Sequence, residues 1–456
     1  MKGNKMQAKC YILLFIIFIV IFACTSSSFS QTTGIYKDKL DNEVTLITKP
    51  EHGTGLVAII AAVKVGSSNE SFQTAGIGNF VAQLLLAGTA LSSAEEVALI
   101  AESVGGNIIA QSHFDFTEIR IVTTSEMFNK SMKLIGESLT QLVFEHKWVE
   151  QTRNNLKSKF LAQDSNYYEI AYQQLRELLY EDNSYRRTPL GSERVIANTT
   201  IADLQKYYSY YYVPNNIIIT VVGDISREHA LDQTSKAFAG VPTAKLPLQR
   251  PIPNETLSQN RLRVLEADIP VAYLMVGWHA PSVTEDDYYA AAVATNALGG
   301  GKGSYMFREL RQKEGIAYDL GVQYPMLKYQ SHILSYILTN PFKISYKEMK
   351  VEFVMDYVQK ILLEQITKLQ NEPLSDTDLK RAKGYTIGSY LLSHQRMIDR
   401  AFRLAWLESI GLGYDFYDSF PEKIEKVTAA DVQRVSNKYF RNYAAVLLLP
   451  STKVQE

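Results

Sequence analysis

Apolar residues recur along the first half of the chain with the periods of both strands and helices. The segments 44–48 and 56–65 are predicted strands, and the second is almost wholly apolar, as in a strand buried on both faces. Residues 107–124 alternate in part and predict a hairpin that turns near 112–114. The other elements predicted here are helices at 75–86, 94–104, 125–142 and 149–179, a helix from Thr200, and a strand at 217–222.

The second half repeats this order of elements after a proline-rich stretch. Four prolines between Pro242 and Pro253 predict a linker. The elements predicted beyond it are strands at 271–278, 316–322, 329–338 and 444–449, and helices at 286–298, 345–369 and 374–392.

Both halves close with the same pattern, 228 residues apart. Thr200 and Asp203 suit a helix N-cap with an acid near the positive end of the dipole, and Thr428 and Asp431 repeat them. We therefore predict an α+β fold of two homologous domains, each a mainly antiparallel β-sheet packed with α-helices. The predicted parts are a signal peptide at 1–23, a tether at 24–33, an N-terminal domain at 34–240, a linker at 241–258 and a C-terminal domain at 259–456.

A cationic segment and a short apolar run open the chain and predict export. Three lysines precede residues 11–23, which at about 1.5 Å per residue span roughly 20 Å, less than the roughly 30 Å of a hydrocarbon core. Residues 21–24 resemble a bacterial lipobox, which implies cleavage before Cys24 and lipidation of its thiol. Cleavage after Ser30 and a single uncleaved anchor are the alternatives. We expect a periplasmic protein, held at the outer membrane of a Gram-negative bacterium if it is lipidated.

Charge and composition exclude several classes of function. The net charge is −1, and no basic patch suited to nucleic acid is indicated. The only cysteines are Cys10 and Cys24, so the folded part has no disulfide and no thiolate metal ligand. The seven histidines include no pair at i, i+4 spacing, and we interpret each as a surface or packing residue.

Residues 298–324 contain the clearest candidate chemistry. A glycine-rich turn is followed by a short helix, a stop at Gly315 and a strand. The turn is not a phosphate-binding loop, because glycine follows Lys302 where serine or threonine is required. Arg311 and Tyr318 both donate hydrogen bonds, and a helix and strand folded back on each other would direct them to one point. The plainer interpretation is a surface arginine and a strand tyrosine.

Several dispersed segments of the mature chain resemble the insulinase/pitrilysin family of zinc peptidases, in its half-size, processing-peptidase-like type. Residues 76–89 resemble the family's zinc helix with its final Gly-Thr. Residues 189–191 and 214–224, with the tyrosine cluster between them, resemble the closing part of its first domain. Residues 298–301 and 309–318 resemble the central motif of its second domain.

The chain departs from this family at the metal site. Catalytic members have His-Xaa-Xaa-Glu-His on the first helix, whereas this chain has Asn79, Ala82 and Gln83 at those positions. Asn79 and Gln83 share a helix face, but amides are poor zinc ligands and Ala82 cannot accept a proton. The resemblance implies a third ligand some 75 residues on, where residues 151–163 contain no acid. We therefore expect this chain to bind no cofactor.

The resemblance implies a role for Arg311 and Tyr318, which the chain retains. In the family such a pair donates hydrogen bonds to a substrate carbonyl near the scissile bond. The implied function is that of a zinc-free subunit of a heterodimeric metallopeptidase, with zinc in a homologous partner subunit and a peptide or unfolded polypeptide as substrate. We expect no activity from this chain alone and no membrane contact beyond a lipid anchor. The alternatives are a non-catalytic peptide-binding or assembly protein and an active zinc enzyme that uses other ligands.

Overall fold

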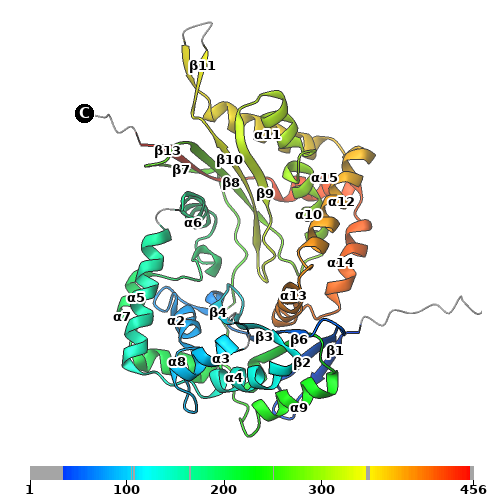
Figure 1. Cartoon of the computed structure of the whole chain (residues 1–456). Coiled ribbons are helices and arrows are strands. Elements are labelled where there is room, and N and C mark those ends of the chain that lie inside the picture. Colours follow the sequence, from blue (N-terminus) through cyan, green and yellow to red (C-terminus); the bar gives the residue numbers. More distant parts are fainter. Residues whose placement is uncertain are drawn as a thin grey trace, which may run out of the picture. The chain divides into compact units, whose positions relative to one another are not determined.

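The computed structural model describes residues 34–103, 105, 108–163, 166–249, 251–345 and 350–451. Within these residues the strands form two main sheets and a small hairpin (Figure 1). The first sheet contains, in spatial order, β1 (Tyr36–Lys39), β2 (Thr45–Pro50), β6 (Ile217–Gly223), β3 (Leu56–Val63), β5 (Thr117–Thr124) and β4 (Ile108–Ser112). The second contains β7 (Arg261–Ala267), β13 (Ala444–Pro450), β8 (Ala272–Ala280), β10 (Ser331–Thr339) and β9 (Ala317–Gln323). The hairpin is β11 (Phe342–Ser345) and β12 (Lys350–Phe353).

Helices pack on both sheets. In the first half they are α2 (Ile77–Leu84), α3 (Ala94–Ser103), α4 (Phe128–Thr140), α5 (His146–Gln163), α6 (Tyr167–Leu179), α7 (Glu193–Asn198), α8 (Ile201–Tyr211) and α9 (Arg227–Ala237). In the second half they are α10 (Asp287–Gly299), the π-helix η5 (Phe307–Lys313), α11 (Met355–Asn371), α12 (Asp376–Leu392), α13 (Met397–Ser409), α14 (Phe416–Glu425) and α15 (Ala429–Tyr439).

The two sheets have the same topology, which confirms the internal repeat. In the first, β6 pairs in parallel with β2 and antiparallel with β3. In the second, β13 pairs in parallel with β7 and antiparallel with β8. The hairpins β4–β5 and β9–β10 then complete the far sides, so β4 and β9 are equivalent edge strands. The predicted α+β class with two sheet-and-helix domains is correct.

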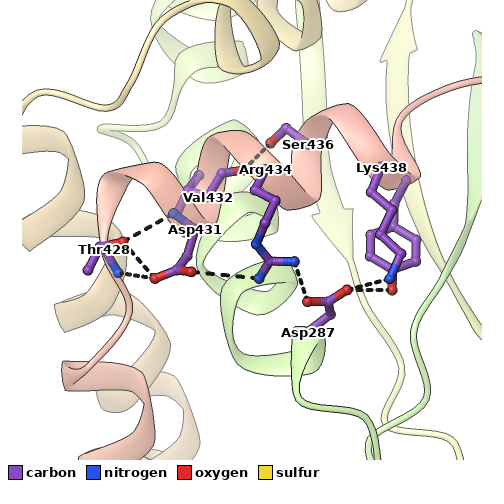
Figure 2. Close-up of polar contacts among 8 residues, drawn as sticks. Asp287, Thr428, Asp431, Val432, Arg434, Ser436 and Lys438 are labelled. Carbon is purple, nitrogen blue, oxygen red and sulfur yellow. Dashed lines mark hydrogen bonds and ion pairs between the residues drawn. The ribbon is translucent and has the colours of Figure 1, made fainter.

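The predicted helix starts are also correct at both copies. Thr200 and Asp203 form a capping box at α8, and Thr428 and Asp431 form one at α15. In each box the threonine accepts a hydrogen bond from the acid's backbone N–H, while the carboxylate accepts one from the threonine's N–H. Figure 2 shows the second box.

Asp287 joins the start of α10 to the second half of α15 in the same region. Its carboxylate accepts from Arg434 at 2.6 Å and Lys438 at 2.7 Å, so α10 is held to α15 (Figure 2). Burial raises the pKa of Asp287, but the hydrogen bonds from Lys438, Arg434 and Tyr439 outweigh it and lower that pKa to about 2. The carboxylate therefore stays ionised over the whole physiological range.

Two predicted helices differ from the observed ones. The helix predicted at 345–369 begins only at Met355, because residues 342–345 and 350–353 pair as β11 and β12. The long helix predicted at 149–179 is two helices, and Asn166 caps the second by accepting from the N–H of Glu169. Periodicity alone missed this restart because apolar residues recur on both sides of it.

Each sheet is covered on one face by a helix from the other half of the chain. In β3, alternate residues pack toward α2 and α4, and the opposite set (Ala58, Ile60 and Ala62) is fully buried on the far face. That face contacts α13, which comes from the second half. Gly223 permits the contact, since a Cβ there would lie 2.8 Å from Met397 Sδ.

The second sheet is covered in the same way by α6 from the first half. Leu175 and Leu179 of α6 form one core with Met275, Leu334 and Val446 of the sheet. A Cβ on the facing Gly277 would lie 2.9 Å from the Leu175 side chain. We call α6 and α13 the exchanged helices.

A buried histidine bonds the exchanged helix α6 to the second sheet. His332 is 1% exposed, and its two ring nitrogens lie 2.8 Å from Tyr172 Oη and 2.9 Å from Tyr180 Oη. Burial lowers its pKa to about 3, so the ring is neutral at physiological pH. His332 is therefore a packing histidine, as predicted.

The predicted linker is fixed at its C-terminal end. The Glu255 carboxylate accepts from the backbone N–H groups of Glu181, Asp182 and Asn183 at 2.6 to 2.9 Å. Gln330 bonds both main-chain groups of Glu255. By contrast, Leu248 is 96% exposed. The boundaries 240 and 259 stay a prediction.

Candidate functional site

Helix α2 is held at its N-terminus, where two glycines let backbone segments meet. Gly76 has a φ of 99°, and a Cβ on it would lie 2.8 Å from Leu190 O. Gly191 has a φ of 87°, and its Cβ would lie 2.2 Å from Gly76 Cα. A side chain at either position would push the 189–191 loop away from the helix. This loop therefore supports the orientation of α2.

The three positions that depart from the zinc motif all lie on α2. Asn79 is 7% exposed, and Ala82 is fully buried. Gln83 donates through Nε2 to Ala110 O at 3.2 Å and accepts at Oε1 from Lys159 Nζ at 3.0 Å. Because an ammonium group can only donate, Lys159 fixes the orientation of the Gln83 amide.

Lys159 is the member of this site that the sequence analysis missed. It lies on α5, 76 residues after Gln83, in the segment where the family resemblance implies a third metal ligand. Only the lack of an acid was noted there. A lysine at the spacing expected for the third metal ligand is the signal that would have identified it. At that position an ammonium group can hydrogen-bond to an amide, whereas a carboxylate would bind a metal.

The side chains at these positions do not fit a zinc ion. Zinc is held by thiolate, imidazole or carboxylate groups, whereas Asn79 and Gln83 offer neutral amides. Lys159 brings a positive charge that repels a cation. Across the ranges that the structure describes, no group of three or more His, Cys, Asp or Glu could hold a metal ion. No chemical step is therefore assigned to a metal on this chain.

Strand β4 is an edge strand, and one row of its main-chain groups pairs with no other strand among the residues described. At the turn into β5, His113 N–H donates to Phe116 O at 2.8 Å. Hydrogen-bonded pairs alternate along an antiparallel ladder, so Gln111 is bonded to β5. Ala110 and Ser112 then direct their main-chain groups to the open side. The Gln83 bond to Ala110 O is made from that side.

A pocket of about 660 Å³ lies along this open edge. It is lined by residues of α2, β4 and the turn after it, α5 and the loop at Pro189, including Asn79, Gln83 and Lys159. Among the described residues of the lining, Lys159 is the only lysine, arginine, aspartate or glutamate. The pocket is thus neutral apart from one ammonium group and the imidazole of His113.

Arg311 and Tyr318 lie at the equivalent edge of the second sheet. Arg311 is on η5, Tyr318 is on β9, and Gly315 between them has a φ of 65°. Arg311 Nη1 donates to Ala317 O and, at 3.0 Å, to Tyr318 O. The Tyr318 side chain is 55% exposed. The stop therefore brings the Arg311 side chain against the main chain of β9, and the Tyr318 phenol is exposed. That the two donors meet at one point stays a prediction.

The glycine-rich turn before η5 allows close packing. A Cβ on Gly299 would lie 2.2 Å from Val322 Cγ2 of β9. Arg381 of α12 donates to Gly300 O at 2.8 Å and to Asn296 O at 3.2 Å, which satisfies the carboxyl end of α10. The turn thereby fixes the distance between α10 and the edge strand.

The predicted lipidation residue Cys24 and the rest of the leader lie outside the described residues. In the part of the chain that is described, no helix has both the length and the apolar character needed to cross a membrane.

Comparisons with known proteins agree with this architecture. Residues 45–193 match the family described as Insulinase (Peptidase family M16), and residues 198–385 match the Peptidase M16 inactive domain. The two matches fall on the two halves of the chain, in agreement with the repeated α+β unit. The chain belongs to the M16 insulinase family, in its half-size form.

Relatives within this family are named for different functions. The zinc protease PqqE of Helicobacter pylori is 24% identical over 419 residues, which cover 88% of this chain and 89% of that protein. The mitochondrial-processing peptidase subunit beta of Saccharomyces cerevisiae is 22% identical over 368 residues, which cover 80% of this chain and 79% of that protein. The non-peptidase homolog YmxG of Helicobacter pylori is 22% identical over 393 residues, which cover 86% of this chain and 88% of that protein. The crystal structure of a protease from Helicobacter pylori matches with a TM-score of 0.83 at 23% identity, over 91% of this chain and 99% of that chain.

Proposed function

We propose that this chain is the zinc-free subunit of a heterodimeric M16 peptidase. One observation carries the proposal: an amide and an ammonium group face each other at the positions for metal ligands, while Arg311 and Tyr318 are retained at the equivalent edge. The homologous partner would supply the zinc and the general base. Relatives named as a subunit and as a non-peptidase homolog support a division of labour within the family.

In this proposal Arg311 and Tyr318 bind the substrate carbonyl. Guanidinium and phenol groups donate to the oxygen that gains negative charge as the peptide bond is attacked. The backbone bonds of Arg311 use Nη1 and hold the guanidinium in place before substrate arrives. The exposed phenol of Tyr318 adds a donor with little conformational freedom. This chain contributes charge stabilisation but no nucleophile.

The substrate in this proposal is an extended peptide. The open edge of β4 offers main-chain donors and acceptors to an added strand, and such pairing depends on backbone conformation more than on side chains. An unfolded polypeptide or a short peptide meets this requirement, whereas a folded domain does not.

Mixing the chain with a zinc-bearing M16 partner tests the proposal. We expect no cleavage of a quenched fluorescent peptide by this chain alone and cleavage by the mixture. Removal of one oxyanion donor typically costs about 10²- to 10³-fold in kcat, so Arg311→Ala should lower the kcat of the mixture by roughly 100-fold. Tyr318→Phe should lower it by roughly tenfold or more, since it removes only the hydroxyl.

Two matched variants control for general damage. Arg308 lies on the same helix but bonds Asp378, and Arg308→Ala should leave the mixed activity nearly unchanged. Tyr210 is similarly exposed on α8, and Tyr210→Phe should do the same. Full activity of the Arg311→Ala mixture would disprove the donor role. Stoichiometric zinc in the purified chain would disprove the zinc-free subunit.

The second candidate is a non-catalytic peptide-binding or assembly protein of the same fold. The unpaired edge of β4 and the name of the non-peptidase relative favour it. Mixing distinguishes the two: an assembly protein would associate with the partner without changing the rate of peptide cleavage.

We also propose that the chain is exported and lipidated at Cys24, because its first residues follow the pattern of a lipoprotein signal. The mass of the mature chain tests this. Loss of the lipid mass in Cys24→Ala is expected, and an unlipidated wild-type chain would contradict it.

A further inference from the structure

Gln83 closes one position of the open edge of β4. The outward main-chain groups of β4 belong to alternate residues, and Ala110 lies in the middle of that row. Its carbonyl accepts from Gln83 Nε2 on the open side, so the Gln83 amide lies where the N–H of an incoming strand would approach. A peptide that pairs with Ser112 therefore loses its next acceptor at Ala110. Such a peptide ends there or leaves the sheet.

The ammonium group of Lys159 lies at this same point. The Gln83 amide bridges it to the main chain of β4, so it lies beside the open edge near Ala110. Side chains of an added strand point to the two faces of the sheet and away from that plane. A peptide that ends at Ala110 brings its C-terminal carboxylate, the main-chain group with a negative charge, to this end of the edge, where the ammonium group attracts it.

Asn79 contributes a further polar side chain to the pocket. Asn79 is 7% exposed and lines the pocket, and its amide forms no hydrogen bond with any residue that the structure describes. Its amide atoms face the pocket and are available to a ligand. The pocket therefore offers amide donors from Asn79 and two free N–H groups of Lys159 to one acceptor-rich group.

We propose that this pocket binds the C-terminal carboxylate of an extended peptide, with Lys159 as its counter-ion and Asn79 as a further donor. The inference rests on the proposed binding of peptides along β4 and names their chemical class. A carboxylate presents two acceptor oxygens, which suits the donors available, and a charge-assisted hydrogen bond is stronger than a neutral one. A peptide whose last residue lies opposite Ala110 matches the edge that Gln83 interrupts.

Peptide binding by the full-length chain, without any partner subunit, tests this inference. The probe is a fluorescein-labelled nonapeptide of alanine, valine and threonine with a free C-terminal carboxylate, measured by fluorescence anisotropy. The same peptide with a C-terminal amide is the second arm, and an amidated peptide whose last residue is glutamate is the third. We expect the free acid to bind about fivefold more tightly than either amide, the modest preference of a partly exposed ion pair.

Substitutions at Lys159 assign the preference to this residue. Lys159→Met should abolish the difference between acid and amide, and Lys159→Arg should keep it. Lys157→Met removes the same charge from the same helix outside the pocket and should also keep it. These readouts are ratios of affinities, so a uniform loss of binding does not imitate the result.

Three outcomes would overturn the inference. They are equal affinities for acid and amide in the wild type, a preference that survives Lys159→Met, and equal binding of the amidated glutamate peptide, which would assign the site to acidic side chains. No cleavage is measured here, so failure of this test leaves the mixing experiment with Arg311→Ala to judge the subunit role.

Discussion

Glu70 is a carboxylic acid buried at the start of α2, close to the positions that depart from the zinc motif. It is 7% exposed and accepts from Gly76 N–H at 2.7 Å and Gly78 N–H at 2.8 Å. Burial raises its pKa to about 7, although both backbone bonds and the nearby Arg187 oppose the shift. Burial wins because the whole carboxyl group is removed from water, whereas Arg187 acts from a distance.

Stability should therefore fall as the pH rises through neutrality. A carboxyl group whose pKa is about 7 in the folded state and about 4.5 in the unfolded state stabilises the fold at low pH and loses this contribution as it ionises. Between pH 5 and pH 8 the free energy of unfolding of the wild type should drop by about 2 kcal/mol relative to Glu70→Gln. Urea unfolding at both pH values measures this difference.

The exposed carboxyl of Glu102 provides the control, since Glu102→Gln should follow the wild type at every pH. Parallel pH profiles of wild type and Glu70→Gln would show that Glu70 is ionised throughout the range.

At the scale of residues, the sequence predicted which residues belong to the site better than it predicted their contacts. Asn79 and Gln83 could be assigned to one helix face because helical spacing is fixed by the backbone. Lys159 could not be assigned to them, because α5 reaches α2 only through tertiary packing. The bond from Arg311 to the carbonyl of Tyr318 was likewise unpredictable, since it depends on how tightly the chain turns at Gly315.

The glycine-rich turn and the edge strand β9 form one packed unit at the scale of elements. Gly299 ends α10 against Val322, and no side chain fits between them. Gly388 lies inside α12 with no atom within 4 Å of an added Cβ. These two glycines therefore respond in opposite ways to the same substitution.

Gly299→Ala should lower the free energy of unfolding by about 1–3 kcal/mol, the usual cost of overpacking. Gly388→Ala should raise it by roughly 0.5–1 kcal/mol, because alanine loses less backbone entropy in a helix. Chemical denaturation of both variants measures the pair. A neutral Gly299→Ala would mean that β9 moves freely away from α10.

Elements were predictable where their signals are local. The capping boxes at Thr200 and Thr428 need only residues three apart, and both are present. Strand β7 was missed because it is an edge strand whose apolar residues are outward, with Leu262 62% exposed and Val264 52% exposed. Alternation in such a strand carries no burial signal, and its parallel partner β13 is far along the chain.

The exchanged helices make the two halves one cooperative molecule. Helix α6 completes the core of the second sheet, and α13 covers the first. Ion pairs add to this connection, such as Arg400 with Glu51 at 2.6 Å and Lys37 with Glu408 at 2.5 Å. The repeat was visible in the sequence, but the exchange was not, because an amphipathic pattern does not identify the surface on which a helix packs.

Cutting the linker should leave the halves associated. We would place a specific protease site at residues 245–249, around the exposed Leu248, and cleave it in the folded protein. The two fragments should elute together on size exclusion and unfold in one transition, because separation would expose the cores under α6 and α13. The uncut protein with the same site is the control. Separate elution would show that the halves are independent domains.

The exchange of helices also determines when each sheet can be covered as the chain is synthesised. The first sheet has all of its strands once Gly223 has been made, yet the face formed by Ala58, Ile60 and Ala62 has no cover until residues 397–409 arrive. Throughout that interval an apolar surface is available for wrong association, as in other chains that fold through exposed intermediates. The nascent first half is thus the vulnerable species, and its protection depends on a helix near the far end of the chain.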